Sequence, residues 1–228
     1  GPSADSFWTW RDVMYGFALT LTPDEMQAIA EMAYVEMLEA GFTRVGEFHY
    51  LHHAPDGRYD TPAEMSLRIM AAAQASGINL THLPVFYAHA DFGGKSPHAG
   101  QRRFIHGLDD FARLIAECRT AMTRPLDRLG VAPHSLRAVT GDELNQLLAL
   151  LPAGPIHMHI AEQLREVDDS VAHSGQRPVE WLLAHAPVDA RWCLIHATHL
   201  TADERRGIAA SGAVAGLVPS NMPGLPNS

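Results

Sequence analysis

The most informative stretch of the chain is residues 156–163 (IHMHIAEQ), which holds two histidines and a carboxylate. On a strand, His157 and His159 point to the same face, and Glu162 follows just beyond the strand end. Neutral imidazole is a preferred zinc ligand, and a carboxylate that does not bind the metal can carry protons to and from water. The pattern therefore predicts a metal-assisted hydrolytic site, with hydrogen-bonded core histidines as the alternative.

A second histidine ends another apolar segment, residues 192–199 (WCLIHATH). An imidazole at the position of His196 can hydrogen-bond an attacking water or a developing oxyanion. The alternative is a packing residue bonded to a backbone carbonyl. The residues alone do not separate these two interpretations.

Two arginines lie in segments that suggest anion binding. HSLRAVT, residues 134–140, pairs His134 with Arg137 at a strand end, and a guanidinium there can bind a carboxylate or phosphate through two hydrogen bonds. An internal salt bridge is the alternative. Arg11, in SFWTWRD, poses the same question, with stacking on Trp8 or Trp10 as the competing interpretation.

Composition limits the other possibilities. The 228 residues include 14 His but only Cys118 and Cys193, so any metal must be held by histidine and carboxylate. The formal charge is -9 and no basic cluster occurs, which argues against nucleic acid or a membrane surface as partner. No apolar run of about 18 residues and no signal-peptide pattern is present, so we expect a soluble, cytoplasmic protein.

These residues must be positioned by an alternation of strands and helices, which predicts βαβ units and a parallel sheet covered on both faces. Thr61 is expected to cap one helix, with Pro62 at its first position and Glu64 completing a capping box. Strands are expected at 43–50, 78–87, 131–136, 156–161, 192–197 and 213–218, and helices at 23–40, 61–76, 108 into the 120s, 141–151, 178–186 and 202–210.

A (β/α)8 barrel fits this α/β pattern better than a nucleotide-binding fold, because no glycine-rich phosphate loop follows a strand. Six strands are fewer than the eight of such a barrel, so an incomplete barrel is expected. The glycine-rich loop 89–102 is a candidate lid or binding loop. The remaining histidines are expected to be solvated or structural; they are His52, His53, His82, His98, His106, His173 and His185.

At these residues the sequence resembles the formimidoylglutamate deiminase family of the amidohydrolase superfamily. The matching stretches lie between Ser6 and His199; they are SFWTWRDVMY, EFHYLHH, GQRRFIHG, HSLRAVT, HIAEQLREVDD, SGQRPVEWL and RWCLIHATH.

The resemblance implies a distorted (β/α)8 barrel with one zinc ion, bound by His159. It implies Glu162 as proton shuttle and His196 as partner of the hydrolytic water. The two carboxylates of the substrate would be held by Arg11, Tyr50, His134 and Arg137. The implied reaction is hydrolysis of N-formimino-L-glutamate, in histidine degradation, to N-formyl-L-glutamate and ammonia.

The sequence also departs from the family. The H-x-H metal pair of the first barrel strand and the metal-binding aspartate of the eighth have no counterpart, so one zinc ligand remains. We therefore expect residues 1–218 to be a partial barrel domain and residues 219–228 to be an irregular proline-rich tail. The chain is expected to be an inactive fragment. The full-length enzyme would form a homodimer. The alternatives are a deaminase or chlorohydrolase of the superfamily that acts on a ring, and a non-catalytic partial domain.

Overall fold

The computed structural model describes residues 18–217, which group into two compact units. One unit comprises residues 21–157, and the other contains residues 158–217. Arg11 and the tail 219–228 lie outside the described residues. The predicted division at residue 218 therefore stays a prediction.

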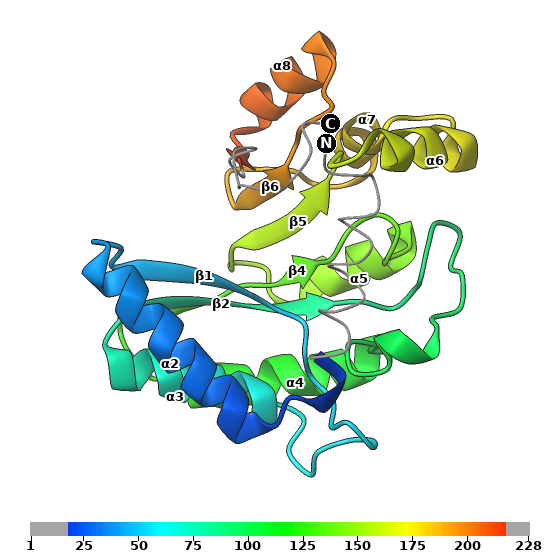
Figure 1. The fold of residues 1–228 in the computed structure, drawn as a ribbon. Helices are drawn as coiled ribbons and strands as arrows, with labels where there is room; N and C mark the ends of the chain where they lie inside the picture. The colour runs from blue at the N-terminus through cyan, green and yellow to red at the C-terminus, as the bar shows by residue number, and fades with distance from the viewer. Residues whose placement is uncertain (1–17, 218–228) are drawn as a thin grey trace, which may run out of the picture. The chain divides into compact units, whose positions relative to one another are not determined.

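The unit of residues 21–157 is a parallel sheet covered by helices (Figure 1). β2 is central and pairs in parallel with β1, β3 and β4, with Glu47 opposite His82 in the register of β1 and β2. Helix α2 packs against α3, and α3 against α4. The strands are β1 (Arg44–His49), β2 (Asn79–Phe86), β3 (Arg128–Leu129) and β4 (Ala132–Pro133); the helices are α2 (Pro23–Glu39), α3 (Glu64–Ser76), the 3-10 turn η1 (Ala99–Gln101), α4 (Leu108–Ala121) and α5 (Gly141–Leu150).

Helix α3 begins two residues later than predicted. The helix begins at Glu64, its N-cap is Ala63, and no side chain caps it. Glu117 of α4 supplies the missing acceptor, because its Oε2 atom accepts the Ala63 N–H at 3.0 Å. A tertiary contact has thus replaced the local capping box expected from Thr61. The predicted end is confirmed, since Gly77 adopts the left-handed conformation at φ 86°.

The second unit continues the alternation. Its sheet has the order β5-β6-β7, and β5 begins in the first unit, where Ile156 forms a parallel bridge with Val131. All six predicted strands are confirmed, with β3 as an additional short one, but helix α6 was not predicted. The elements are β5 (Ile156–Ile160), α6 (Leu164–Ser174), α7 (Pro178–His185), β6 (Trp192–His196), α8 (Ala202–Ser211) and β7 (Val214–Gly216).

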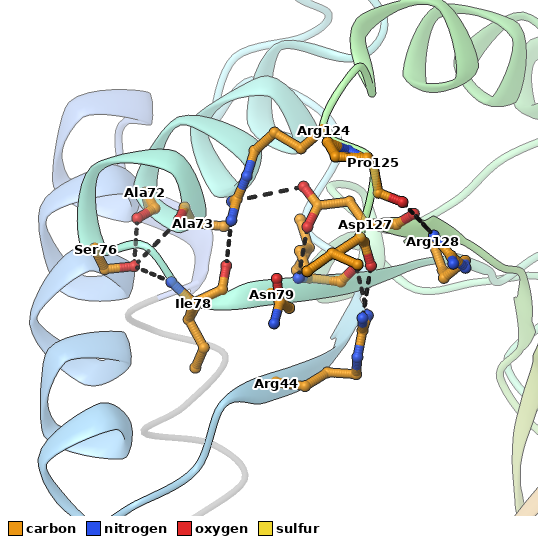
Figure 2. A network of polar contacts seen from close by, with 12 residues as sticks. Arg44, Ala72, Ala73, Ser76, Ile78, Asn79, Arg124, Pro125, Asp127 and Arg128 are labelled. Carbon is orange, nitrogen blue, oxygen red and sulfur yellow. Dashed lines mark hydrogen bonds and ion pairs between the residues drawn. The ribbon is translucent and has the colours of Figure 1, made fainter.

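A polar network closes the amino-terminal edge of the first sheet (Figure 2). Asp127 Oδ1 accepts the Leu80 N–H at 2.9 Å, and Asp127 Oδ2 lies 3.6 Å from Arg124 Nη1. Arg44 donates to the carbonyl of Leu126 at 2.6 Å and to Thr81 Oγ1 at 3.1 Å. In barrel folds this edge of the strands serves stability rather than chemistry.

Four histidines of the first unit are buried together beneath the carboxyl end of its sheet. Ring centroids are 5.5 Å apart for His49 and His82, 5.4 Å for His49 and His52, and 4.7 Å for His52 and His106. None of the four is more than 3% exposed. Burial, and for all but His82 also the charge of neighbouring histidines, lowers their pKa, to about 3 for His49 and His82 and about 2 for His106. The histidines of this cluster are therefore neutral packing residues, and none of them is solvated.

Within residues 18–217, no helix combines the length and the apolar character needed to cross a bilayer.

Candidate active site

Strand β5 presents its two histidines on one face, as predicted. Ile156, Met158 and Ile160 are fully buried, whereas His157 and His159 are half-buried on the opposite face. The alternation follows from the two-residue period of a strand. Burial lowers the pKa of His157, which favours the neutral form of that ring.

Three predicted site residues meet at the carboxyl ends of β5 and β6. The rings of His159 and His196 stack with centroids 5.4 Å apart and an interplanar angle of 26°. His196 Nε2 lies 3.6 Å from Glu162 Oε1, and both side chains are partly exposed, at 19% and 27%. A carboxylate and two imidazoles, open to solvent and close enough to share a water molecule, form a group that can move protons.

The backbone at this site is strained. Ala161, His196 and Ala197 have φ values of 51°, 70° and 47°, and they are the residues other than glycine with positive φ among those described. Side chains disfavour this region by about 1 kcal/mol or more per residue. The strain is thus confined to the residues that carry or flank Glu162 and His196.

Two further predicted residues meet in the first unit. The ring of His134 lies 6.5 Å, centroid to centroid, from that of Tyr50 and 4.5 Å from that of Tyr87. His134 Nδ1 is 3.1 Å from Ser135 Oγ, and the His134 N–H donates to the carbonyl of Phe86. Tyr50 follows β1 and His134 follows β4, so both lie at carboxyl ends of the first sheet.

Arg137 is half-buried in the same unit, and its Nε atom is buried with no hydrogen-bond partner among the described residues. An unsatisfied guanidinium donor is costly, by about 1–3 kcal/mol. Its charge reaches Asp91: partial burial raises the pKa of Asp91, but hydrogen bonds from Lys95 and the Phe92 N–H, with the charges of Lys95 and Arg137, outweigh burial and lower it. The Arg137 side chain is therefore suited to bind an added anion.

The loop that carries Asp91 is fastened at its start. His89 Nε2 lies 2.9 Å from Glu143 Oε2, and the His89 N–H donates to the carbonyl of Ala138. Glu143 also accepts the Thr140 N–H at the start of α5. These contacts tie the loop to the segment that holds Arg137, although a lid role for the loop stays a prediction.

The described residues do not fit a complete zinc site. The role of His159 as a ligand stays a prediction, and no group of three or more His, Cys, Asp or Glu side chains within residues 18–217 is arranged to hold a metal ion. A zinc ion bound at His159 needs ligands from beyond this range.

One residue that sequence reasoning missed contacts the site directly. Glu166 lies in the first turn of α6, is only 5% exposed, and accepts hydrogen bonds from the N–H groups of Ala161 and Glu162. The signal was present, since Glu166 follows Glu162 by four residues, but α6 itself was not predicted.

Comparisons with known proteins identify the fold. No protein-family model matches the chain. A crystal structure of an amidohydrolase from Brucella melitensis superposes with a TM-score of 0.93 at 60% sequence identity, covering 96% of this chain and 49% of that one. The chain belongs to the amidohydrolase superfamily.

Other members of the superfamily are similar to the chain. It is 50% identical over 99% of its length to formimidoylglutamate deiminase from Pseudomonas aeruginosa, and 26% identical over 89% to 8-oxoguanine deaminase from the same organism. Atrazine chlorohydrolase from Arthrobacter aurescens, complexed with zinc, shares the fold at TM-score 0.74 and 18% identity, covering 95% of this chain and 46% of that one. The chain spans about half the length of these curated relatives, 50% and 44%. The predicted partial barrel of the amidohydrolase type is therefore confirmed.

Proposed function

We propose that this chain supplies half of a zinc-dependent deiminase that hydrolyses N-formimino-L-glutamate to N-formyl-L-glutamate and ammonia, a step of histidine degradation. The observation that carries the proposal is the 50% identity to formimidoylglutamate deiminase over 99% of the chain. The fold alone does not choose the substrate, because chlorohydrolases and ring deaminases share it.

Glu162 and His196 carry the proton chemistry in this proposal. Glu162 takes a proton from the attacking water and delivers it to the nitrogen that leaves as ammonia. His196, at 3.6 Å from Glu162, donates a hydrogen bond to the water and fixes its approach to the formimino carbon. One water could contact both groups from the side, at about 2.8 Å from each atom.

Zinc would be held in part by His159 and would supply Lewis-acid activation of water. The described residues include no group of three or more His, Cys, Asp or Glu side chains that could hold the ion, so the proposal needs further ligands.

Arg137 supports a substrate with carboxylates. Its buried Nε atom lacks a partner in the described part of the chain, and a carboxylate would satisfy it. Tyr50 and His134, which lie together in the same unit, are proposed as further substrate contacts, as is Arg11. A dicarboxylate substrate would also account for arginines at the site of a protein whose net charge is -9.

A ring deaminase is the second candidate, favoured by the 26% identity to 8-oxoguanine deaminase. Such a substrate has no carboxylates for Arg137 to bind. A non-catalytic partial domain is the third, because the described residues do not complete a metal site. We further propose that the whole enzyme is cytoplasmic and forms a homodimer.

The test is ammonia release by the whole protein, expressed with zinc, from N-formimino-L-glutamate and from 8-oxoguanine. A kcat/KM at least about 100-fold higher for the linear diacid supports the proposal. A preference for the ring substrate would overturn it in favour of the second candidate, and no release from either would favour the third.

A further inference from the structure

The buried carboxylate of Glu166 accepts two backbone hydrogen bonds from the turn that carries Glu162. Glu166 Oε1 accepts the Ala161 N–H at 3.0 Å, and Glu166 Oε2 accepts the Glu162 N–H at 3.0 Å. A carboxylate in the first turn of a helix commonly caps that helix. Here Gln163 is the N-cap and makes no side-chain cap bond, and Glu166 reaches back to the residues before the helix.

These two amides belong to a strained turn that needs support. Ala161 adopts φ 51°, which an alanine in a free loop would rarely keep. In that conformation its N–H faces Glu166 while its carbonyl accepts the N–H groups of Thr198 and His199, at 3.2 and 3.0 Å. The turn is thus held from α6 on one side and from the segment after β6 on the other.

The same contacts reach His196. The Ala197 N–H donates to the carbonyl of Ile160 at 3.0 Å, and both His196 and Ala197 have positive φ. The turns after β5 and β6 are therefore locked to each other through backbone hydrogen bonds. Each turn carries one member of the Glu162–His196 pair.

We infer that Glu166 is a positioning residue: it holds the turn at Ala161 in the conformation that keeps the Glu162 carboxylate beside His196. Its role in catalysis rests on the proposed function, whereas its hold on the backbone does not. Without the two hydrogen bonds to Glu166, Ala161 would relax to a negative φ, and the Glu162 side chain would turn away from His196.

A matched control separates positioning from ordinary stabilisation. Glu204 is also buried, at 4% exposure, lies in the first turn of α8, and accepts two backbone N–H groups, those of Thr201 and Glu180. It also pairs with Arg177. Replacing Glu204 by glutamine weakens two comparable backbone bonds and the ion pair to Arg177, and the hydrogen bonds of Glu204 in the described residues do not include the Ala161 or Glu162 amides.

The first measurement is amide hydrogen exchange of this chain with Glu166→Gln and Glu204→Gln. Glutamine offers one acceptor oxygen and an NH2 group that repels the second amide. Glu166→Gln is expected to reduce protection of the Ala161 and Glu162 amides at least about tenfold while the amides of β5 keep theirs. Unchanged protection at Ala161 and Glu162 would overturn the inference.

The second measurement is kcat and KM of the whole protein with N-formimino-L-glutamate. Glu166→Gln is expected to lower kcat about tenfold and Glu166→Ala about 100-fold, with KM within about twofold. Glu204→Gln, at a similar loss of thermal stability, is expected to keep kcat within about twofold. Equal losses of kcat in the Glu166 and Glu204 variants would reduce Glu166 to a structural residue. An inactive wild type would refute the proposed function, and the exchange experiment would then decide the positioning role alone.

Discussion

The Nε2 atom of His196 lies 3.6 Å from Oε1 of Glu162, across the carboxyl ends of the neighbouring strands β5 and β6. The fold brings the two side chains together although Glu162 and His196 are 34 positions apart in the sequence. The distance is too long for a strong direct hydrogen bond. It suits two groups that contact one water molecule placed beside them, and the first prediction follows from this.

Glu162→Gln is expected to lower kcat by about 10²- to 10⁴-fold, because the amide cannot take a proton from water. KM should change little, since other residues bind the substrate. Ammonia release by the whole protein measures both constants. Asp168→Asn, an exposed change on α6, is the control and should leave them unchanged. If Glu162→Gln kept half of the wild-type kcat, another group would have to move the proton.

Arg137→Met is expected to raise KM for the diacid about 100-fold while kcat falls far less. The variant removes a charged donor that the proposed substrate would pair with, at a cost of about 2–5 kcal/mol in comparable buried pairs. Arg113→Met, at an exposed site on α4, is the matched control. An unchanged KM would count against a dicarboxylate substrate and favour a ring substrate.

The buried histidine cluster predicts acid sensitivity. Each of its members has a folded-state pKa far below its ordinary value, about 3 for His82, so below pH 6.5 the unfolded chain binds protons that the folded chain does not. Stability is therefore full above about pH 7 and is lost as pH falls towards the folded pKa, by about 1 kcal/mol per histidine per pH unit near pH 5.5.

Urea unfolding between pH 7.5 and 5 checks this prediction. His82→Leu removes both buried nitrogens without partners, and the loss of stability per pH unit should become smaller by about 1 kcal/mol. His173→Gln, an exposed change on α6, should leave about the same slope. If the His82 variant retained the wild-type slope, the cluster would not be the source of the acid sensitivity.

Periodicity predicted the elements well because it reports which face of a segment is buried. His157 and His159 share a face of β5 for that reason, and the strand ends carry Tyr50, His134 and His196 as expected. Contacts between distant residues were beyond such reasoning. Glu117 accepts the Ala63 N–H at the start of α3, where a cap from Thr61 was expected. For His52 and His82 the sequence left solvated and structural roles open, and their burial shows the structural role. The zinc ligand set stays a prediction, as do the roles of Arg11, Tyr50 and Arg137 in binding.

The network in Figure 2 predicts where the first unit is vulnerable. Asp127→Ala leaves the Leu80 N–H and the Arg124 guanidinium without their carboxylate, at a cost of about 3 kcal/mol. Asp127→Asn keeps an acceptor for Leu80 and should cost about 1 kcal/mol. The urea midpoint of each variant measures the difference. Equal urea midpoints for the two variants would contradict this prediction. They would show that an acceptor for the Leu80 N–H adds no stability beyond that lost with the ion pair to Arg124.

Metal content is the last prediction. Within residues 18–217 no three ligating side chains converge, and His159 is the one residue assigned to zinc, so the 228-residue chain is expected to retain well below one zinc per chain after dialysis. Zinc that does bind weakly should depend on the neutral imidazole of His159 and decrease further in His159→Ala, because a single nitrogen donor cannot hold the ion against water. Elemental analysis of the purified chain measures its zinc content, with His173→Ala as a control for non-specific surface binding. Stoichiometric zinc that survives dialysis, together with ammonia release from N-formimino-L-glutamate, would mean that these residues rearrange into a working site on their own.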